Sequence, residues 1–336
     1  MTSTKELRPE TGPIEPSQSA GITPRLSVIV VFFNMRREAG RTLYSLSTNY
    51  QHGVNANSYE VIAIDNGSAE PLSESMVRSY GENFHYRFYS TTSISPVEAT
   101  NDAVRKCRGN FIMVMIDGAH ILSPGVIANT FAAFSAYENP FVATVPFHLG
   151  AEVQNRSILK GYNQSVEDRL LATQDWKADG YRLFLLTGSL SDGSMGWFGR
   201  LFESNCFALT KGAFLKLGGF SEGFKARGGG LVNLDFFAQA LSCPDLTYVL
   251  LLGEGTFHQF HGGVASNAPA NAHPWNEFHN EFVAIRGRSF ATVPRRPILL
   301  GRISPSATRI ALASANLGLN WWQHNDVLLE RDFRGD

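Results

Sequence analysis

The chain has 336 residues, of which 43% are hydrophobic and 18% charged, and its formal net charge is -1. This is a globular composition with enough apolar material for a large core. The even charge balance and the lack of a Lys/Arg block argue against a protein that binds nucleic acid. Three widely separated cysteines without CxxC spacing favour a reducing compartment over a disulfide set or a cysteine-based zinc site.

The N-terminal residues contain no apolar signal region, and no apolar stretch approaches the ~20 residues that span a membrane. We therefore expect a cytoplasmic protein without a transmembrane segment, and peripheral attachment to a membrane stays open. Residues 1–24 are rich in Thr, Ser, Pro and Glu and lack periodicity, which predicts a disordered tail.

Ordered structure is expected from Leu26, where the continuous apolar run 27–33 predicts a buried strand. Further strands are predicted at 59–64, 84–89, 111–116 and 141–147, with helices between them that cover about 35–50, 71–80, 96–107 and 124–134. This alternation of strand and helix predicts an α/β fold with a mostly parallel sheet and helices on both faces.

Periodicity is weaker over residues 148–200, and it returns with predicted strands at 202–209 and 247–252. A helix is expected after the glycines 228–230, and Ser304-Pro305 is predicted to open another. We therefore expect a main domain over residues 25–290 and a helical extension over 291–336. The extension would pack on the core or on a second subunit, so a homodimer through it is a candidate assembly.

Asp117 and His120 follow directly after the apolar run 111–116. In open α/β sheets, ligands gather beyond the carboxyl ends of the strands. A carboxylate and an imidazole at that edge could hold a divalent cation against a phosphate. The alternative is a loop Asp that caps a turn and a His that only packs, and the two residues alone do not decide between these interpretations.

His258 and His261 lie in a glycine-rich segment after the last predicted strand of the main domain. A single His is usually structural, but two within such a loop favour a ligand role, and either could turn inward. Mn²⁺ suits a mixed set of carboxylate and imidazole ligands better than Mg²⁺ does.

Residues Leu26 to His261 carry four short motifs whose order and spacing resemble the GT-A glycosyltransferases, in particular the large inverting family 2. These motifs are the opening strand 27–34, the turn Ile64-Asp65-Asn66-Gly67-Ser68, the approach Gly109-Asn110-Phe111-Ile112 to Asp117, and the turn Gly218-Gly219-Phe220-Ser221-Glu222. The resemblance implies a Rossmann-like, mostly parallel sheet flanked by helices. It also implies transfer of a sugar from a nucleotide-diphosphate donor to a hydroxyl on a saccharide, lipid or small molecule.

The resemblance also assigns site residues. Contacts to the nucleotide-sugar are expected from Val31, Phe33, Asp65, Asn101 and Asp117, and a divalent metal, Mn²⁺ or Mg²⁺, is expected on Asp117, His120, His258 and His261. Val31 and Phe33 stand where the family usually has Pro and Tyr. Asp65 would contact the nucleoside, although an Asx turn in Asp65-Asn66-Gly67-Ser68 would also explain it.

The chain departs from the family pattern at two places. The Asp-x-Asp motif has become Asp117-Gly118-Ala119, and the Glu-Asp motif that supplies the catalytic base aligns with Val232-Asn233. Asp235, two residues further on, is the first candidate base, and its alternative role is a partner of the helix dipole. Glu203 and Glu222 are rival candidates.

Two other functions compete with glycosyl transfer. A nucleotidyltransferase shares the alternating α/β layout and the metal on carboxylates, but it usually has a glycine-rich loop after the first strand, and residues 32–37 contain no glycine. A degenerate relative that binds nucleotide or sugar without catalysis would explain the two altered motifs.

Overall fold

The computed structural model describes residues 24–188, 190 and 194–325. The predicted tail, apart from Pro24, and the last eleven residues of the predicted extension lie outside these ranges.

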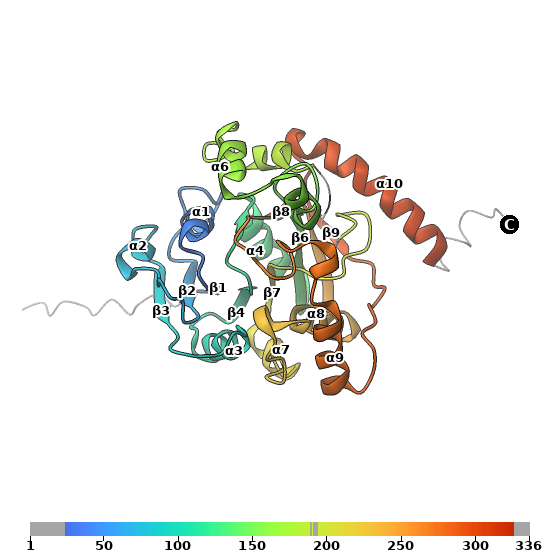
Figure 1. The fold of residues 1–336 in the computed structure, drawn as a ribbon, viewed down its shortest axis with the longest axis horizontal. Helices are drawn as coiled ribbons and strands as arrows, with labels where there is room; N and C mark the ends of the chain where they lie inside the picture. Colours follow the sequence, from blue (N-terminus) through green and yellow to red (C-terminus); the bar gives the residue numbers. More distant parts are fainter. Residues whose placement is uncertain (1–23, 189, 191–193, 326–336) are drawn as a thin grey trace, which may run out of the picture.

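A nine-stranded mixed sheet forms the centre of the described chain (Figure 1), with strand order β3-β2-β1-β4-β7-β6-β8-β5 and β9 paired to β8. The strands are β1 Leu26–Phe32, β2 Tyr59–Asp65, β3 Phe84–Phe88, β4 Phe111–Met115, β5 His120–Leu122, β6 Pro140–His148, β7 Phe207–Thr210, β8 Thr247–His258 and β9 Ile298–Gly301. Strands β3, β2, β1 and β4 run parallel to one another, whereas β7 and β5 are antiparallel to their neighbours. The sheet and its flanking helices match the predicted fold class.

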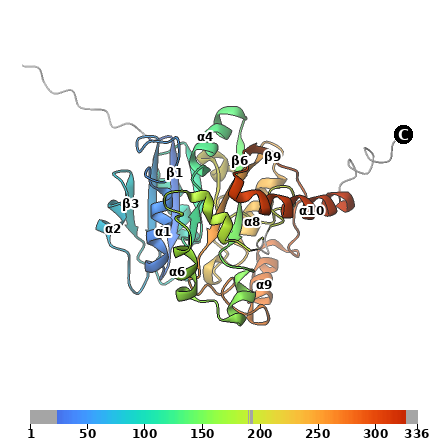
Figure 2. The same ribbon diagram turned by 90° about the horizontal axis from the view of Figure 1, so that it is seen from above.

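The sheet is buried on both faces, which explains the continuous apolar strands. Along β1, Val28 and Val30 pack into one core, while Ile29 and Val31 pack into the other. Figure 2 shows the helices arranged around the sheet from above. They are α1 Arg36–Leu46, α2 Glu74–Arg78, α3 Val97–Lys106, α4 Val126–Ala136, α5 Gln154–Ser157, α6 Gln164–Ala172, α7 Lys211–Lys216, α8 Val232–Ser242, α9 Trp275–Arg286 and α10 Thr308–Asn325.

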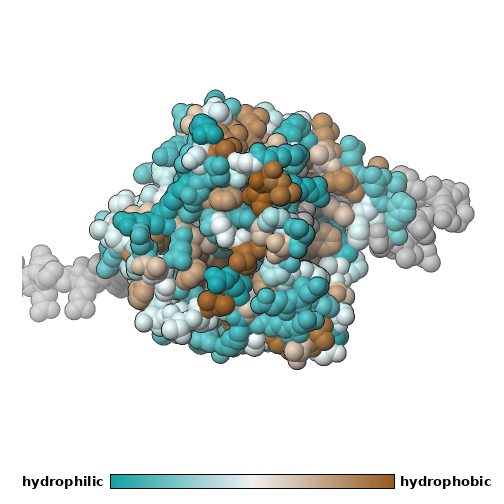
Figure 3. All heavy atoms as spheres, viewed as in Figure 1, coloured by the Kyte–Doolittle hydropathy of each residue, from teal (hydrophilic) through white to brown (hydrophobic). Residues whose placement is uncertain are grey.

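The two cores divide the helices between the faces of the sheet. Buried residues of α1, α2 and α4 join the core that contains Val28, and those of α3, α6, α7, α8, α9 and α10 join the core that contains Ile29. On the face seen in Figure 3, apolar residues lie in small groups among hydrophilic ones. No helix among the described residues is long and apolar enough to cross a membrane.

Three boundary predictions need correction. The strand predicted at 202–209 begins only at Phe207, and the strand predicted at 247–252 continues to His258, because β5 and β6 pair with its second half. The segment from 291 is not wholly helical, since β9 pairs in parallel with β8 and extends the sheet before α10 begins. The homodimer through this segment stays a prediction.

Candidate active site

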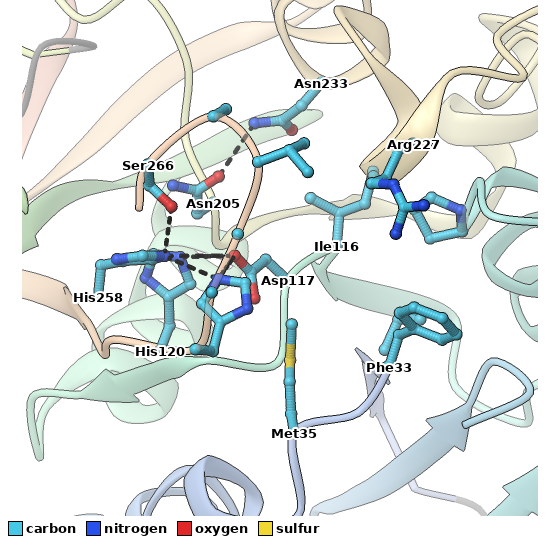
Figure 4. Close-up of a pocket in the computed structure, with 18 of the residues that line it drawn as sticks. Phe33, Met35, Ile116, Asp117, His120, Asn205, Arg227, Asn233, His258 and Ser266 are labelled. Carbon is cyan, nitrogen blue, oxygen red and sulfur yellow. Dashed lines mark hydrogen bonds and ion pairs between the residues drawn. The ribbon is translucent and has the colours of Figure 1, made fainter. Parts of the chain in front are cut away.

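A cavity of about 480 Å³ opens beyond the carboxyl ends of β1 and β4 (Figure 4). Its walls come from segments far apart in the sequence. Among the lining residues are Val31, Phe33, Asn66, Asp117, His120, His148, Glu203, Asn205, Arg227, Asn233, His258, His261 and Ser266. The cavity therefore lies where an open α/β sheet is expected to bind its ligands.

Strand register brings three histidines together at one wall. His120 on β5 pairs with His258 on β8, and His148 on β6 pairs with the same residue from the other side. The ring centroids lie 4.9 Å apart for His120 and His258, and 5.2 Å apart for His148 and His258. Because paired residues of adjacent strands project to the same face, the sheet itself positions this row of imidazoles.

Of the four residues predicted to bind metal, Asp117, His120 and His258 bring their ligand atoms close together, and His261 lies beside Asp117 and His258. Asp117 Oδ2 lies 3.8 Å from His120 Nε2, 3.6 Å from His258 Nε2 and 3.4 Å from His261 Nε2. The Nε2 atoms of His258 and His261 are 3.2 Å apart. The other carboxylate oxygen, Oδ1, accepts a hydrogen bond from the Ala119 N–H, so Oδ2 is the oxygen turned to the imidazoles.

A chain of amide groups determines which ring nitrogen of His258 carries the proton. Asn267 Oδ1 accepts hydrogen bonds from the backbone N–H groups of residues 261–263, so its Nδ2 is the atom that donates to Gln154 Oε1. Gln154 Nε2 donates to the His258 carbonyl, and Gln154 Oε1 then faces His258 Nδ1 at 2.8 Å. Since Oε1 can only accept, Nδ1 carries the proton, and Nε2 presents its lone pair to the cluster.

The His120 ring is buried without a hydrogen bond. Its side chain is 1% exposed, and neither ring nitrogen has a hydrogen-bond partner among the described residues. A buried polar atom without a partner is costly unless a ligand or ion satisfies it. The unsatisfied ring, the lone pair of His258 and the Asp117 carboxylate together form a donor set that fits a divalent cation.

Burial and mutual charge shift the pKa values in the cluster. Burial raises the pKa of Asp117, but the neighbouring imidazoles, His261 first, outweigh it and hold that pKa well below its usual value. Burial lowers the pKa of His120 and of His258 to about 4, although Asp117 opposes the shift in both. For His261 burial also acts downward, yet Asp117 raises the pKa above its usual value. The charge of Asp117 therefore favours protonation of His261, whereas burial favours the neutral form of His120 and His258.

Glu203 is the candidate base that lines the cavity. Asn233 Nδ2, at the start of α8, donates to Glu203 Oε2 at 2.9 Å. Among the described residues Oε1 has no hydrogen-bond partner. Burial, followed by the charge of Asp117, raises the pKa of Glu203, although the hydrogen bond from Asn233 acts in the opposite direction. A carboxylate of raised pKa with one free oxygen can take a proton from a hydroxyl.

The other two candidate bases lie elsewhere. Asp235 accepts hydrogen bonds from Arg286, at 3.0 and 2.5 Å, and from Gln239 at 2.7 Å, and it does not line the cavity. Asn233 and Asp235 lie two positions apart on α8, so they project to different sides of the helix. Glu222 is exposed and lies 3.8 Å from Arg105. The position of Asp235 outside the cavity and its pairing with Arg286 argue against it as the base, and the position of Glu203 favours that rival candidate; the choice stays a prediction.

The predicted nucleotide contacts divide in the same way. Val31 and Phe33 line the cavity with Asp117, whereas Asp65 and Asn101 do not. Both Asp65 oxygens accept backbone N–H bonds from the segment that follows, from Ser68 at 2.8 Å and from Leu72 at 2.9 Å, so the bond from Ser68 agrees with the turn alternative and the bond from Leu72 extends it. Asn101 exchanges two hydrogen bonds with the backbone of Phe220, so it ties α3 to the glycine turn. These bonds give both residues a structural role and argue against their predicted role as nucleotide contacts.

Several cavity residues were not predicted from the sequence. Asn66 is 3% exposed and lines the cavity, and its Oδ1 has no hydrogen-bond partner among the described residues. Arg227 projects at the cavity wall opposite Phe33 (Figure 4), and its guanidinium forms no ion pair within the described chain. Its position directly before three glycines could have indicated from the sequence that Arg227 lies in a loop at the site. His148 and Gln154 gave none, because only strand register and loop packing bring them to the site.

Comparison with known proteins identifies the family. Residues 27–202, just over half of the chain, match the family described as Glycosyl transferase family 2. No curated protein matches the sequence. Similar solved structures include residues 1–349 of TarS from S. aureus in complex with UDP, with a TM-score of 0.49 and 12% identity, covering 93% of this chain and 75% of that one. Another is the mannosyltransferase PcManGT from Pyrobaculum calidifontis in complex with GDP-Man and Mn2+, with a TM-score of 0.46 and 15% identity, covering 96% and 80%. The family match spans both β1 and Asp117, and the chain belongs to glycosyl transferase family 2.

Proposed function

We propose that this glycosyltransferase moves a sugar from a nucleotide-diphosphate donor to an acceptor hydroxyl with the help of a divalent cation. The observation that carries the proposal is the placement of Asp117, the imidazole cluster and Glu203 around one cavity. Such a transfer needs a stabilised diphosphate leaving group and a base for the acceptor hydroxyl, and one cavity offers groups suited to both.

Asp117, His120, His258 and His261 would hold the cation. When bound there, a divalent ion supplies positive charge against the diphosphate as the anomeric C–O bond breaks. Arg227, which also lines the cavity, adds a second positive charge from the chain itself. Arginine suits phosphate oxygens because its planar fork donates two parallel hydrogen bonds.

Glu203 takes the proton from the acceptor hydroxyl in this proposal. The Asn233 hydrogen bond holds Oε2 and leaves Oε1 for the hydroxyl. The raised pKa strengthens Glu203 as a base. A base that acts while the hydroxyl oxygen attacks the anomeric carbon gives inversion, and the nucleoside diphosphate leaves with the bonding electrons.

Two uncharged amide oxygens are available to accept hydrogen bonds from the donor substrate. Asn66 Oδ1 and Asn233 Oδ1 are buried without hydrogen-bond partners among the described residues, and both side chains line the cavity. Each can accept a hydrogen bond from an N–H or O–H group. We assign Asn66 to the nucleoside, because it follows β2 beside the cavity wall formed by Phe33, and Asn233 to a sugar hydroxyl.

The test is a panel of UDP-, GDP- and dTDP-sugars, with release of the nucleoside diphosphate measured with and without Mn²⁺. Wild-type protein should turn over at least one donor, and Asp117→Asn should lose both turnover and cation-dependent nucleotide binding. Glu222→Gln is the matched control, because this exposed carboxylate does not line the cavity. Absence of turnover with every donor would contradict the proposal.

A degenerate binder is the second candidate, favoured by the loss of acidic side chains at Ala119 and Asn233. Its signature in the same panel is tight nucleotide binding, measured by calorimetry, without release of product. That outcome would move the function from transfer to recognition.

A further inference from the structure

We propose that helix α10 and the arginines beside it form a docking surface for an anionic membrane. The surface consists of Leu312, Leu319, Arg296, Arg302 and Arg309, and we call it the α10 ridge. None of these residues lines the cavity, so the inference goes beyond the proposed function and does not depend on it.

The inner face of α10 packs directly on the main domain. Ile310 and Ser314 are buried. The Ser314 hydroxyl accepts a hydrogen bond from the Phe198 N–H and donates one to the Met195 carbonyl, both at 2.9 Å. A Cβ on Gly318 would lie 2.1 Å from the Phe198 carbonyl oxygen, so only glycine allows the helix to approach the chain this closely. This packing fixes which side of the helix faces outward.

The outer face of α10 exposes two leucines on one side of the helix. Leu312 is 64% exposed and Leu319 is 52% exposed, and positions seven apart lie on the same side of an α-helix. Figures 1 and 2 show α10 at the edge of the molecule, away from the central strands. Among the described residues, six of the twelve exposed large apolar side chains lie between 298 and 319, so apolar exposure is concentrated at this edge. Such a concentration indicates an interaction surface.

The charge of this part of the chain is positive. Residues 282–325 contain six arginines and neither aspartate nor glutamate, although the whole chain has a net charge of -1. Arg302 and Arg309 are exposed and form no ion pair within the described chain. The hydrogen bonds of Arg309 go to the uncharged carbonyls of Thr187 and Gly188. Both arginines therefore keep a positive charge that an anionic partner can neutralise.

The arginines lie at both ends of the leucine pair. Arg309 precedes Leu312 by three positions, so the two side chains are neighbours on the helix. Near the other end of α10, the exposed Arg296 places its guanidinium 5.3 Å from the ring centre of Trp322, three positions after Leu319. An apolar stripe between basic side chains is typical of a helix that lies in the interface of an anionic membrane.

An anionic lipid surface fits this combination better than a second copy of the chain does. Two copies paired through α10 would bring arginines against arginines, because residues 282–325 offer no carboxylate to pair with them. Acidic headgroups attract the arginines, while the leucines enter the boundary of the acyl chains. The convex side of a helix also suits a deformable lipid surface, whereas a helical peptide partner binds in a groove.

The experiment is co-sedimentation of the full chain with vesicles of phosphatidylcholine, with and without phosphatidylglycerol. We expect the chain to bind the vesicles that contain the anionic lipid and to stay in the supernatant with phosphatidylcholine alone. High salt should release it, because screening weakens the attraction between the arginines and the headgroups. Equal binding to both kinds of vesicle, or binding to neither, would overturn the proposal.

Variants of the α10 ridge identify the residues that bind. Leu312→Gln combined with Leu319→Gln should weaken vesicle binding at least about tenfold, since burial of even one leucine contributes that much. Arg302→Gln should weaken it about fivefold, the contribution of one arginine at an anionic surface. Leu215→Gln is the matched control, because this leucine on α7 is 47% exposed and lies outside the ridge. Vesicle binding that the leucine variant retains in full would overturn the proposal.

Sedimentation velocity separates the lipid surface from a second copy. A dimer that Leu312→Gln dissociates, in a chain that binds no vesicles, would assign the ridge to a second copy and overturn the proposal. Release of nucleoside diphosphate is measured without vesicles, so vesicle binding without turnover would keep this inference and remove the glycosyl transfer. Turnover without vesicle binding would do the reverse.

Discussion

Replacing Glu203 by Gln tests the assignment of the base. The two side chains have the same shape, and the amide oxygen of Gln can still accept the 2.9 Å hydrogen bond from Asn233. The substitution therefore removes the ability to take a proton while it keeps the packing and this hydrogen bond. General-base catalysis contributes about 10²–10⁴-fold to rate, which corresponds to roughly 3–5 kcal/mol in the activation barrier.

The assay is the steady-state rate of nucleoside diphosphate release with a saturating acceptor. We expect kcat to fall at least ~10²-fold in Glu203→Gln, while the dissociation constant of the nucleotide stays within about twofold. Asp235→Asn is the control on α8, because Asp235 pairs with Arg286 outside the cavity. Its melting temperature should fall while kcat is kept. A kcat lost in Asp235→Asn but retained in Glu203→Gln would refute the assignment.

Three further predictions concern stability and recognition. Metal-free protein should lose stability as the pH falls from 6.5 towards 4. His120 and His258 have folded pKa values of about 4, so below pH 6.5 the unfolded chain binds protons that the folded chain excludes, at about 1.4 kcal/mol per pH unit for each ring. The raised pKa of His261 stabilises the folded chain below pH 6.5, and this effect is lost only above that pH, so it does not oppose the loss of stability on acidification. Denaturant titrations at several pH values measure this change in the free energy of unfolding. Asp65→Asn should lower the free energy of unfolding by about 1.5–3 kcal/mol without weakening nucleotide binding, because its carboxylate accepts hydrogen bonds from the backbone N–H groups of Ser68 and Leu72. Asn66→Ala should weaken nucleotide binding about tenfold by calorimetry, because it removes the unpartnered Oδ1; loss of the 3.3 Å hydrogen bond from Nδ2 to the Ser95 carbonyl should lower the free energy of unfolding by about 1 kcal/mol.

The alternation of strands and helices could be predicted because each buried strand is a continuous apolar run bounded by glycine or polar residues. The same pattern located Asp117, since a carboxylate after such a run marks the ligand-binding edge of the sheet. The histidines 258 and 261 could be proposed but not ranked. Which of the two lies beside His120 depends on the pairing of β5 with β8. This contact joins residues more than 130 positions apart, and no local pattern encodes it.

Helix geometry explains why Asp235 lies away from the cavity that Asn233 lines. Asp235 is the carboxylate nearest in sequence to the altered motif Val232-Asn233, and nearness in sequence is a poor guide on a helix. Positions two apart project about 200° apart, so a group at 235 cannot replace one that faces the cavity from 233. The direction of the Glu203 side chain could not be predicted in the same way, because residues 202–206 are irregular where the sequence predicts a strand. Helical phase is therefore the sequence signal that argues against Asp235.

The altered Asp-x-Asp motif follows from local packing. Ala119 is fully buried, its N–H bonds Asp117 Oδ1, and its carbonyl accepts the N–H of Gln259. A second aspartate at this position would place a charge in the apolar core without a partner, at a cost of several kcal/mol. A side chain on Gly118 would overlap the ring of Phe32, so this position cannot supply a ligand either. The next residue outward is His120, at the first position of β5, and its register with His258 brings a second imidazole to the same point. The position that the family motif gives to its second Asp thus lies in the apolar core, and strand pairing instead brings two imidazoles close to Asp117.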